Sequence, residues 1–248
     1  MLIEQSAYAN RWRRTTPAAK ALFSLGGFIA AFSAASPSAS LSVAAVLAVV
    51  TLAGAGVPLG RYLRVLAPGL FFLAASCLSL AFTLGPDAES GALSVYLSDQ
   101  GLQQVRTVGS RSLAALLALL FLVLSTPLID LIALLRRLRV PETLLEIMVL
   151  CYRMLFVFSE AVHDTMTAQS ARLGYATPRL VLRSHAGLVA CLTVQIWQRA
   201  RDLHSAALSR NNDGPLRFLE PEFAHKGRDL TIAALASSLL IALALGVR

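Results

Sequence analysis

Residues 107–124 read TVGSRSLAALLALLFLVL, and no charged side chain follows Arg111 within them. A helix that crosses a bilayer needs about 20 predominantly apolar residues. This stretch is close to that length, and Arg111 near its start can extend its guanidinium group toward the interface. The stretch therefore predicts a transmembrane helix.

Four further apolar stretches lie at residues 21–35, 41–57, 65–84 and 230–247. The first is short for a bilayer, but tilt or burial among other helices would accommodate it. It also has the charged start and apolar run of a signal peptide, yet further spans follow it instead of a soluble domain, so we expect it to be retained. The five stretches predict an all-α polytopic membrane protein with about five transmembrane helices.

Composition also favours lipid as the solvent for much of the chain. Hydrophobic residues make up 56% and charged residues only 15%, whereas about a quarter of a soluble domain is charged. The N-terminal segment, the Arg61/Arg64 loop and residues 126–228 are basic, whereas residues 85–104 hold acidic residues and no Lys or Arg. By the positive-inside tendency, we expect a cytoplasmic N-terminus and an external C-terminus.

The net charge of +8 does not indicate nucleic-acid binding, because neither interleaved aromatic residues nor a known motif accompanies it. The chain has no G-x-x-x-x-G-K-[ST] motif for ATP hydrolysis by a P-loop, and its carboxylates are scattered. The histidines and cysteines lack metal-ligand spacing: His163, His185, His204, His225, Cys77, Cys151 and Cys191. We therefore expect no catalytic site, metal site or cofactor in this chain.

Residues 126–227 differ from the spans around them because arginine is frequent throughout. An amphipathic helix at 128–139 is too short to cross a bilayer and is expected at the interface. Two long helices follow, from Pro141 to a stop at Gly174, and from the N-cap Thr177 to about Arg210. The expected division is residues 1–125 with four spans, 126–227 as a cytoplasmic helical domain, and 228–248 as a C-terminal transmembrane helix.

Neither long helix is expected to span the bilayer. Glu146 and Arg153 interrupt the apolar first half of the first one, and charges at mid-bilayer are costly. The apolar core of the second, residues 187–197, is too short to cross. Small residues in the second helix allow another helix to approach closely, with or without a partner protein: Ala186, Gly187 and Ala190.

Each long helix ends in a small residue followed by arginine, in Ser170-Ala171-Arg172-Leu173 and Leu208-Ser209-Arg210-Asn211. An arginine at a helix C-terminus presents several donors from a defined position, which suits an acidic groove on a partner. The same arginine also compensates the negative end of the helix dipole. The spacing alone leaves both interpretations open.

With these motifs, the chain resembles the T components of energy-coupling factor transporters, in particular the CbiQ type from cobalt and nickel importers. The resemblance covers essentially the whole chain, and the central segment is its most specific part. The matching residues are Trp12 with Pro17-Ala18-Ala19-Lys20, Ser125-Thr126-Pro127, LLRRLRVP at 134–141, Tyr152-Arg153, Phe156-Val157-Phe158 and the two arginine-bearing helix ends, which resemble paired Ala-Arg-Gly motifs.

Both motifs depart from the family pattern. Leu173 stands where the family has Gly, and the second motif has Ser209 for Ala and Asn211 for Gly. Asn tolerates the left-handed conformation that Gly adopts at a helix end, whereas Leu adopts it poorly. We therefore expect the first long helix to end one residue later than the family pattern. The arginines Arg172 and Arg210 are kept in both motifs.

The resemblance implies a non-catalytic subunit of the bacterial inner membrane that couples two kinds of partner across the lipid bilayer. Two cytoplasmic ABC-type ATPase subunits would bind and hydrolyse ATP, and a CbiM-like membrane subunit would capture the ion. The implied ATPase-docking residues are Ala171, Arg172, Leu173, Ser209, Arg210 and Asn211.

Four alternatives to cobalt import remain at this stage. Nickel or another micronutrient is the first, since the capture subunit would set specificity. A conventional permease would need polar residues inside several spans, which are here nearly uniform Ala, Leu, Val and Phe. A membrane-embedded enzyme would need clustered carboxylates or histidines, and a scaffold without transport would not retain ATPase partners.

Overall fold

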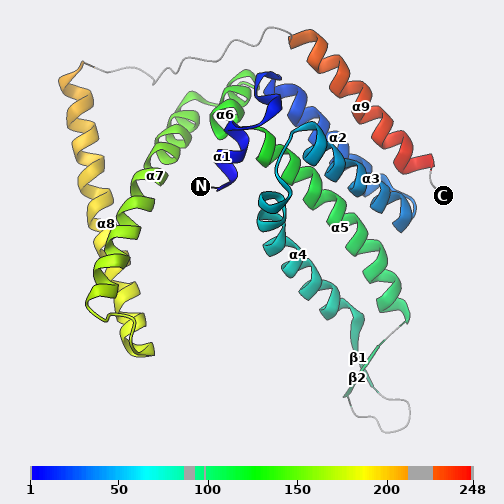
Figure 1. Ribbon diagram of the computed structural model, residues 1–248, viewed down its shortest axis with the longest axis horizontal. Coiled ribbons are helices and arrows are strands. Elements are labelled where there is room, and N and C mark those ends of the chain that lie inside the picture. Colours follow the sequence, from blue (N-terminus) through cyan, green and yellow to red (C-terminus); the bar gives the residue numbers. More distant parts are fainter. Residues whose placement is uncertain (1, 87–92, 98, 212–225, 247–248) are drawn as a thin grey trace. The chain divides into compact units, whose positions relative to one another are not determined.

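The computed structural model describes residues 2–86, 93–97, 99–211 and 226–246 (Figure 1). Its elements are α1 (Leu2–Tyr8), a 3-10 turn (Arg11–Arg14), α2 (Pro17–Ser33), α3 (Pro37–Val49), a π turn (Val50–Gly54), α4 (Leu59–Ala81), β1 (Phe82–Pro86), β2 (Leu93–Leu97), α5 (Asp99–Ser125), α6 (Leu128–Arg137), α7 (Glu142–Ala171), α8 (Pro178–Ser209) and α9 (Lys226–Gly246).

The chain forms two compact units. The membrane unit comprises Met1–Leu134 and Glu220–Arg248, and the second unit, here called the helical-pair unit, comprises Leu135–Leu219. Proline is the first residue of α2, α3 and α8, and in α3 and α8 a hydroxyl group caps the helix start. Ser36 accepts from the N–H of Ala39, and Thr177 accepts from the N–H of Leu180. The start predicted for α8 is thereby confirmed.

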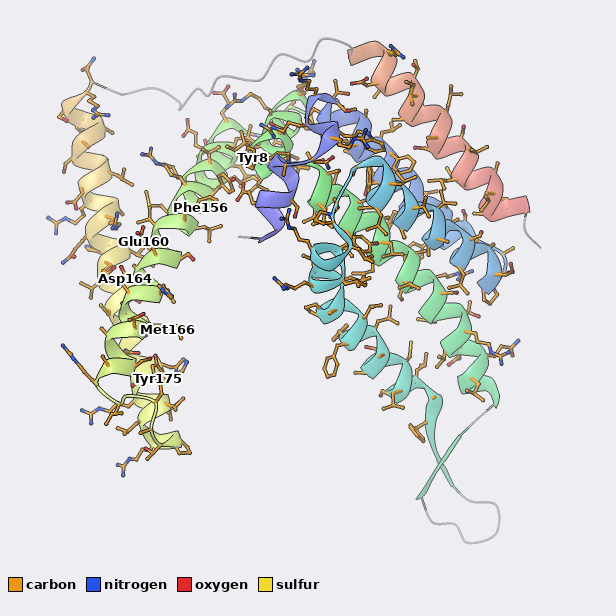
Figure 2. The ribbon with its side chains drawn as sticks, in the orientation of Figure 1. Tyr8, Phe156, Glu160, Asp164, Met166 and Tyr175 are labelled. Atoms are coloured by element: carbon orange, nitrogen blue, oxygen red, sulfur yellow. The ribbon has the colours of Figure 1, made fainter. Side chains whose placement is uncertain are left out.

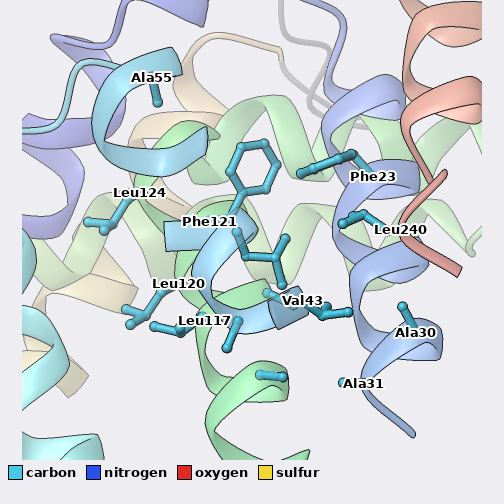
Figure 3. Close-up of a cluster of buried hydrophobic side chains, with 14 of the residues drawn as sticks. Phe23, Ala30, Ala31, Val43, Ala55, Leu117, Leu120, Phe121, Leu124 and Leu240 are labelled. Atoms are coloured by element: carbon cyan, nitrogen blue, oxygen red, sulfur yellow. The ribbon is translucent and has the colours of Figure 1, made fainter. Parts of the chain in front are cut away.

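The core of the membrane unit lies among α2, α3, α5 and α9, and small side chains dominate it (Figure 3). A Cβ built on Gly26 of α2 would lie 2.4 Å from the Cβ of Ser237 in α9, and one on Gly27 would lie 3.1 Å from Leu47. Membrane helices pack by such close approach, because lipid supplies no hydrophobic drive between them. Phe121 of α5 completes the core with edge-on contacts to Phe23 and Trp12.

Helix α4 packs mainly on α5, where Gly69 admits the side chain of Leu116, and only its Tyr62 and Leu66 are buried. After α4, strands β1 and β2 pair in antiparallel register with Phe82 opposite Leu97. The sequence predicted a polar loop over residues 85–104, which is wrong for this segment. Residues 93–97 read LSVYL, whose Val and Tyr favour extended backbone, and α5 begins at Asp99.

Among the described residues, five helices are long and apolar enough to cross a membrane: Pro37–Gly54, Leu59–Ala81, Gly101–Ser125, Pro178–Ser209 and Gly227–Gly246. The all-α polytopic class is thus confirmed, although the set differs from the predicted one. The first predicted span corresponds to α2, an apolar but shorter helix, and α8 joins the set in its place. The uncharged part of α8, residues 184–198, extends about 23 Å, less than the roughly 30 Å of hydrocarbon. Its cytoplasmic location stays a prediction.

Candidate functional site

The two arginine-bearing helix ends have the same backbone geometry. Helix α7 ends at Ala171 and α8 at Ser209, and the next residue in each is the arginine. Arg172 has φ −95° and ψ 14°, and Arg210 has φ −98° and ψ 11°. The residues after them are both left-handed, with φ 56° at Leu173 and φ 52° at Asn211.

Hydrogen bonds at the two ends also correspond. The N–H of Leu173 donates to the carbonyl of Ser170 at 3.0 Å, and the N–H of Asn211 donates to that of Leu208 at 3.0 Å. At the first end, the N–H of Gly174 donates to the carbonyl of Gln169 at 2.9 Å. The two bonds donated by Leu173 and Gly174 together form a Schellman motif, a common way for a helix to end at a left-handed residue.

The expectation that the first helix would end one residue late is therefore wrong. Leu173 takes the left-handed conformation that the family pattern gives to Gly, in spite of its Cβ. The intrinsic preference of leucine is overridden because residues on both sides of it are held by hydrogen bonds. The two motifs in consequence terminate their helices at equivalent positions.

Both arginines are exposed. Among the residues that the structure describes, neither guanidinium makes an ion pair or a side-chain hydrogen bond. Two guanidinium groups thus stand on matched helix ends with their donors open to another molecule. A partner bearing carboxylates could accept from them in bidentate fashion.

Side-chain hydrogen bonds close the turn between α7 and α8, where Figure 2 labels Tyr175. The Gln169 amide joins both helices, because its Nε2 donates to the carbonyl of Ser184 at 2.9 Å and its Oε1 accepts from the Tyr175 hydroxyl at 2.6 Å. Ser184 Oγ in turn donates to the carbonyl of Gly174 at 2.8 Å. We call Gln169, Tyr175 and Ser184 the clasp. The sequence spacing does not reveal the clasp, because Gln169 and Ser184 lie 15 residues apart on opposite sides of the turn.

Outside the turn, the helical-pair unit leaves its apolar side chains uncovered. Helix α8 has no buried residue and α7 has one, Leu145. Leu182 is 74% exposed and Trp197 is 70% exposed. The three small residues predicted for packing, Ala186, Gly187 and Ala190, are also exposed, and a Cβ on Gly187 would meet nothing within 4 Å. Large apolar side chains exposed in this number are typical of a surface that contacts protein partners or lipid.

One charged group that the sequence analysis passed over lies in the membrane unit. Asp130, in the first turn of α6, is 3% exposed and accepts from Arg13 Nη1 at 3.1 Å. Nearby, the buried ammonium of Lys20 donates to the carbonyl of Ser125 at 2.8 Å. The N-terminal segment thereby ties the end of α5 and the start of α6 to the bundle. A lone acidic residue within the apolar run LIDLIALL was the signal available in the sequence.

Metal-ligating side chains do not gather in the part of the chain that is described: no group of three or more His, Cys, Asp or Glu is placed to hold an ion. His225 lies outside the described residues, and Cys77, Cys151 and Cys191 are free thiols.

Comparison with known proteins gives consistent matches. A family model described as cobalt transport protein, CbiQ, matches residues 9–218, which include both helix ends. Cobalt transport protein CbiQ of Rhodobacter capsulatus is 37% identical over 218 residues, 88% of this chain and 86% of that protein. CbiQ of Salmonella typhimurium is 26% identical over 208 residues, 81% of this chain and 92% of that one.

A third relative is a fused protein. The fused cobalt transport protein CbiMQ of Methanocorpusculum labreanum is 28% identical over 252 residues, 99% of this chain but 41% of the fusion. Because the family model spans most of the sequence and the Rhodobacter protein matches over nearly its whole length, this multi-pass membrane protein belongs to the CbiQ family of cobalt transport proteins.

Proposed function

We propose that this chain is the transmembrane coupling subunit of an ATP-driven cobalt importer of the energy-coupling factor type. The observation that carries the proposal is the pair of matched helix ends. Two equivalent backbone terminations, 38 residues apart, each present an exposed arginine without a partner among the described residues. A dipole role requires a cation near each helix end, but it does not require the same left-handed residue after each arginine.

In the proposed mechanism, Arg172 and Arg210 each dock in an acidic groove of one cytoplasmic ATPase subunit. The ATPases bind and hydrolyse ATP, and this chain performs no catalysis. Closure and opening of the ATPases move the ends of α7 and α8, and the helices carry that motion toward the membrane. The N-terminus lies in the cytoplasm in this arrangement, on the same side as both docking ends.

A CbiM-like membrane subunit captures the ion in this proposal. The fused CbiMQ relative supports such a partner, because one polypeptide there joins a region similar to this chain to further sequence. The exposed apolar side chains of α7 and α8 would contact the capture subunit, with Ala186, Gly187 and Ala190 allowing a helix of the partner to approach.

The proposal is tested by co-expressing the tagged chain with its candidate ATPase and capture subunits and purifying the complex in mild detergent. We expect Arg172→Glu/Arg210→Glu to lose the ATPase and to keep the capture subunit. Arg201→Glu makes the same charge reversal on an exposed residue of α8, away from its end, and should keep both partners. ATPase that remains bound to the double variant would make the two arginines dipole caps only.

Cargo is tested in the same cells by uptake of radiolabelled cobalt with nickel as competitor. Cobalt uptake should require all the subunits and should fall to background in the double variant. Uptake of nickel in preference to cobalt would correct the cargo but not the coupling role.

A further inference from the structure

Leu173 carries a conformation that its side chain disfavours. With φ 56° it lies in the left-handed region, where the Cβ of a non-glycine residue crowds the backbone. Such residues persist only where the surrounding structure holds them, and they gather at functional sites. At the matching position after α8, Asn211 has φ 52°, and asparagine adopts this conformation readily. The first helix end therefore needs a support that the second does not.

The clasp supplies that support. Leu173 lies between Gln169 and Gly174, whose backbone groups bond to each other at 2.9 Å. The Gln169 side chain is anchored on Ser184 and Tyr175, and the Gly174 carbonyl accepts from Ser184 Oγ. Gln169 before Leu173 and Gly174 after it are thus both fixed to Ser184 of α8, and Leu173 between them has little freedom to leave its left-handed conformation.

The fit around the clasp is close. A Cβ on Gly174 would lie 2.7 Å from Ser184 Oγ and 2.9 Å from the Gln169 carbonyl, so only glycine allows Ser184 to reach this turn. The Tyr175 ring packs edge-on against His185 at 5.6 Å between centroids. The Tyr175 hydroxyl is therefore held in place for its bond to Gln169 by ring packing as well.

Among the residues described up to Asn211, the second helix end shows no equivalent of the clasp. Ser209 Oγ donates to the carbonyl of Ala206 within its own helix, and the remaining bonds there are backbone bonds of the helix end. The two helix ends thus reach the same backbone geometry by different means. One uses a residue that tolerates the conformation, and the other uses side chains from a neighbouring helix.

We infer that Gln169, Tyr175 and Ser184 are positioning residues that hold Leu173 left-handed and so aim the Arg172 guanidinium for docking. The inference rests on the proposed function of Arg172. A preformed end has less conformational freedom to lose on binding, and a docking-competent state that is fully populated does not weaken the apparent affinity. The clasp does for the first motif what glycine does in the family pattern.

The test measures binding of the purified ATPase partner to the full chain in nanodiscs, in an Arg210→Glu background, where docking depends on the first end. Tyr175→Phe removes one clasp bond and should weaken binding about three- to tenfold. Gln169→Leu removes both bonds of the Gln169 amide and should weaken binding at least as much. Thr193→Val removes a hydroxyl that bonds within α8 at 2.8 Å and should leave binding unchanged.

Rescue distinguishes aiming from packing. Leu173→Gly removes the strain that the clasp offsets, so adding it to Tyr175→Phe should restore binding to within about twofold of the background variant. A clasp that merely packs α7 on α8 would not be rescued by that change. Failure of the rescue, or unchanged binding in both clasp variants, would overturn the inference.

A second readout needs no ATPase. Hydrogen exchange at the Gly174 amide in the full chain should quicken about three- to tenfold in Tyr175→Phe, and an unchanged rate would overturn the clasp on its own. The Arg172→Glu variant, in the same background, reports separately on the proposed function. If it binds the ATPase as well as its parent, docking through Arg172 fails, while the exchange rates still decide whether the clasp holds Leu173.

Discussion

The membrane unit and the helical-pair unit use apolar residues in opposite ways. In the first, small side chains bring helices so close that Ala30, Ala31 and Ala118 are fully buried. In the second, two helices of 30 and 32 residues bury a single side chain, Leu145. The membrane unit thus stabilises itself, whereas the helical-pair unit presents its apolar surface to something else. That difference suits the proposed coupling role, in which one part of the chain stays anchored and the other responds to partners.

The largest difference in stability between the units is expected when a bulky residue is placed in each unit in turn. Gly26→Leu must displace Ser237 of α9, so we expect unfolding to become easier by about 1–3 kcal/mol or more. Gly187→Leu meets no atom within 4 Å and should not lower the apparent Tm of the full chain in detergent. Equal losses in both variants would remove the contrast between the units.

The next largest effect concerns the ion pair between Arg13 and Asp130, which holds the start of α6. Asp130→Asn leaves Arg13 without its carboxylate, and we expect a loss of about 1–3 kcal/mol, below that of a fully buried pair because the Arg13 side chain is 36% exposed. Asp164→Asn is the matched change on an exposed residue of α7. Thermal unfolding of the two variants should separate them clearly, and a control as unstable as Asp130→Asn would show that this pair is not an anchor.

Exposed apolar residues of α8 should matter for partners and not for stability. Trp197→Ser is expected to leave the apparent Tm nearly unchanged, since the ring is 70% exposed. Retention of the CbiM-like subunit in pull-downs should fall about tenfold if Trp197 is an interface anchor. A drop in Tm with full retention of the partner would instead make this surface part of the fold of the free chain.

The smallest effect compares the two helix ends. Leu173→Gly should stabilise the turn between α7 and α8 by about 0.5–1 kcal/mol, because relief of left-handed strain exceeds the entropy that glycine loses on folding. Asn211→Gly should stabilise its helix end by less than this, because asparagine already tolerates the left-handed conformation. Opening free energies from hydrogen exchange can resolve this difference, and equal gains at both ends would mean that Leu173 is not strained.

Sequence periodicity and composition predicted the helical membrane class and the paired arginine ends, because both depend on local properties. An apolar run of about 20 residues and an arginine after a long helix are visible without knowledge of contacts. The left-handed Leu173 was missed because local propensity argues against it, and only Gln169 and Ser184 explain it. A local rule failed where a neighbouring helix overrides it.

Long-range contacts were likewise out of reach. Arg13 and Asp130 are 117 residues apart, and nothing in their spacing joins them. The β1–β2 pairing was hidden because residues 85–104 contain the acidic and small residues typical of a loop. Helix α8 remained ambiguous for a physical reason: its overall hydropathy is that of a span, but its arginines leave too short an uncharged segment.

The most direct measurement is the affinity of the ATPase partner for the full chain reconstituted with its capture subunit in nanodiscs. We predict that Arg172→Glu/Arg210→Glu weakens binding by at least about 30-fold, since removing one member of a desolvated charge pair costs about 2–5 kcal/mol, whereas Arg201→Glu binds like the wild type. Equal affinities for the wild type and the double variant would contradict the assignment of the two helix ends as ATPase-docking sites.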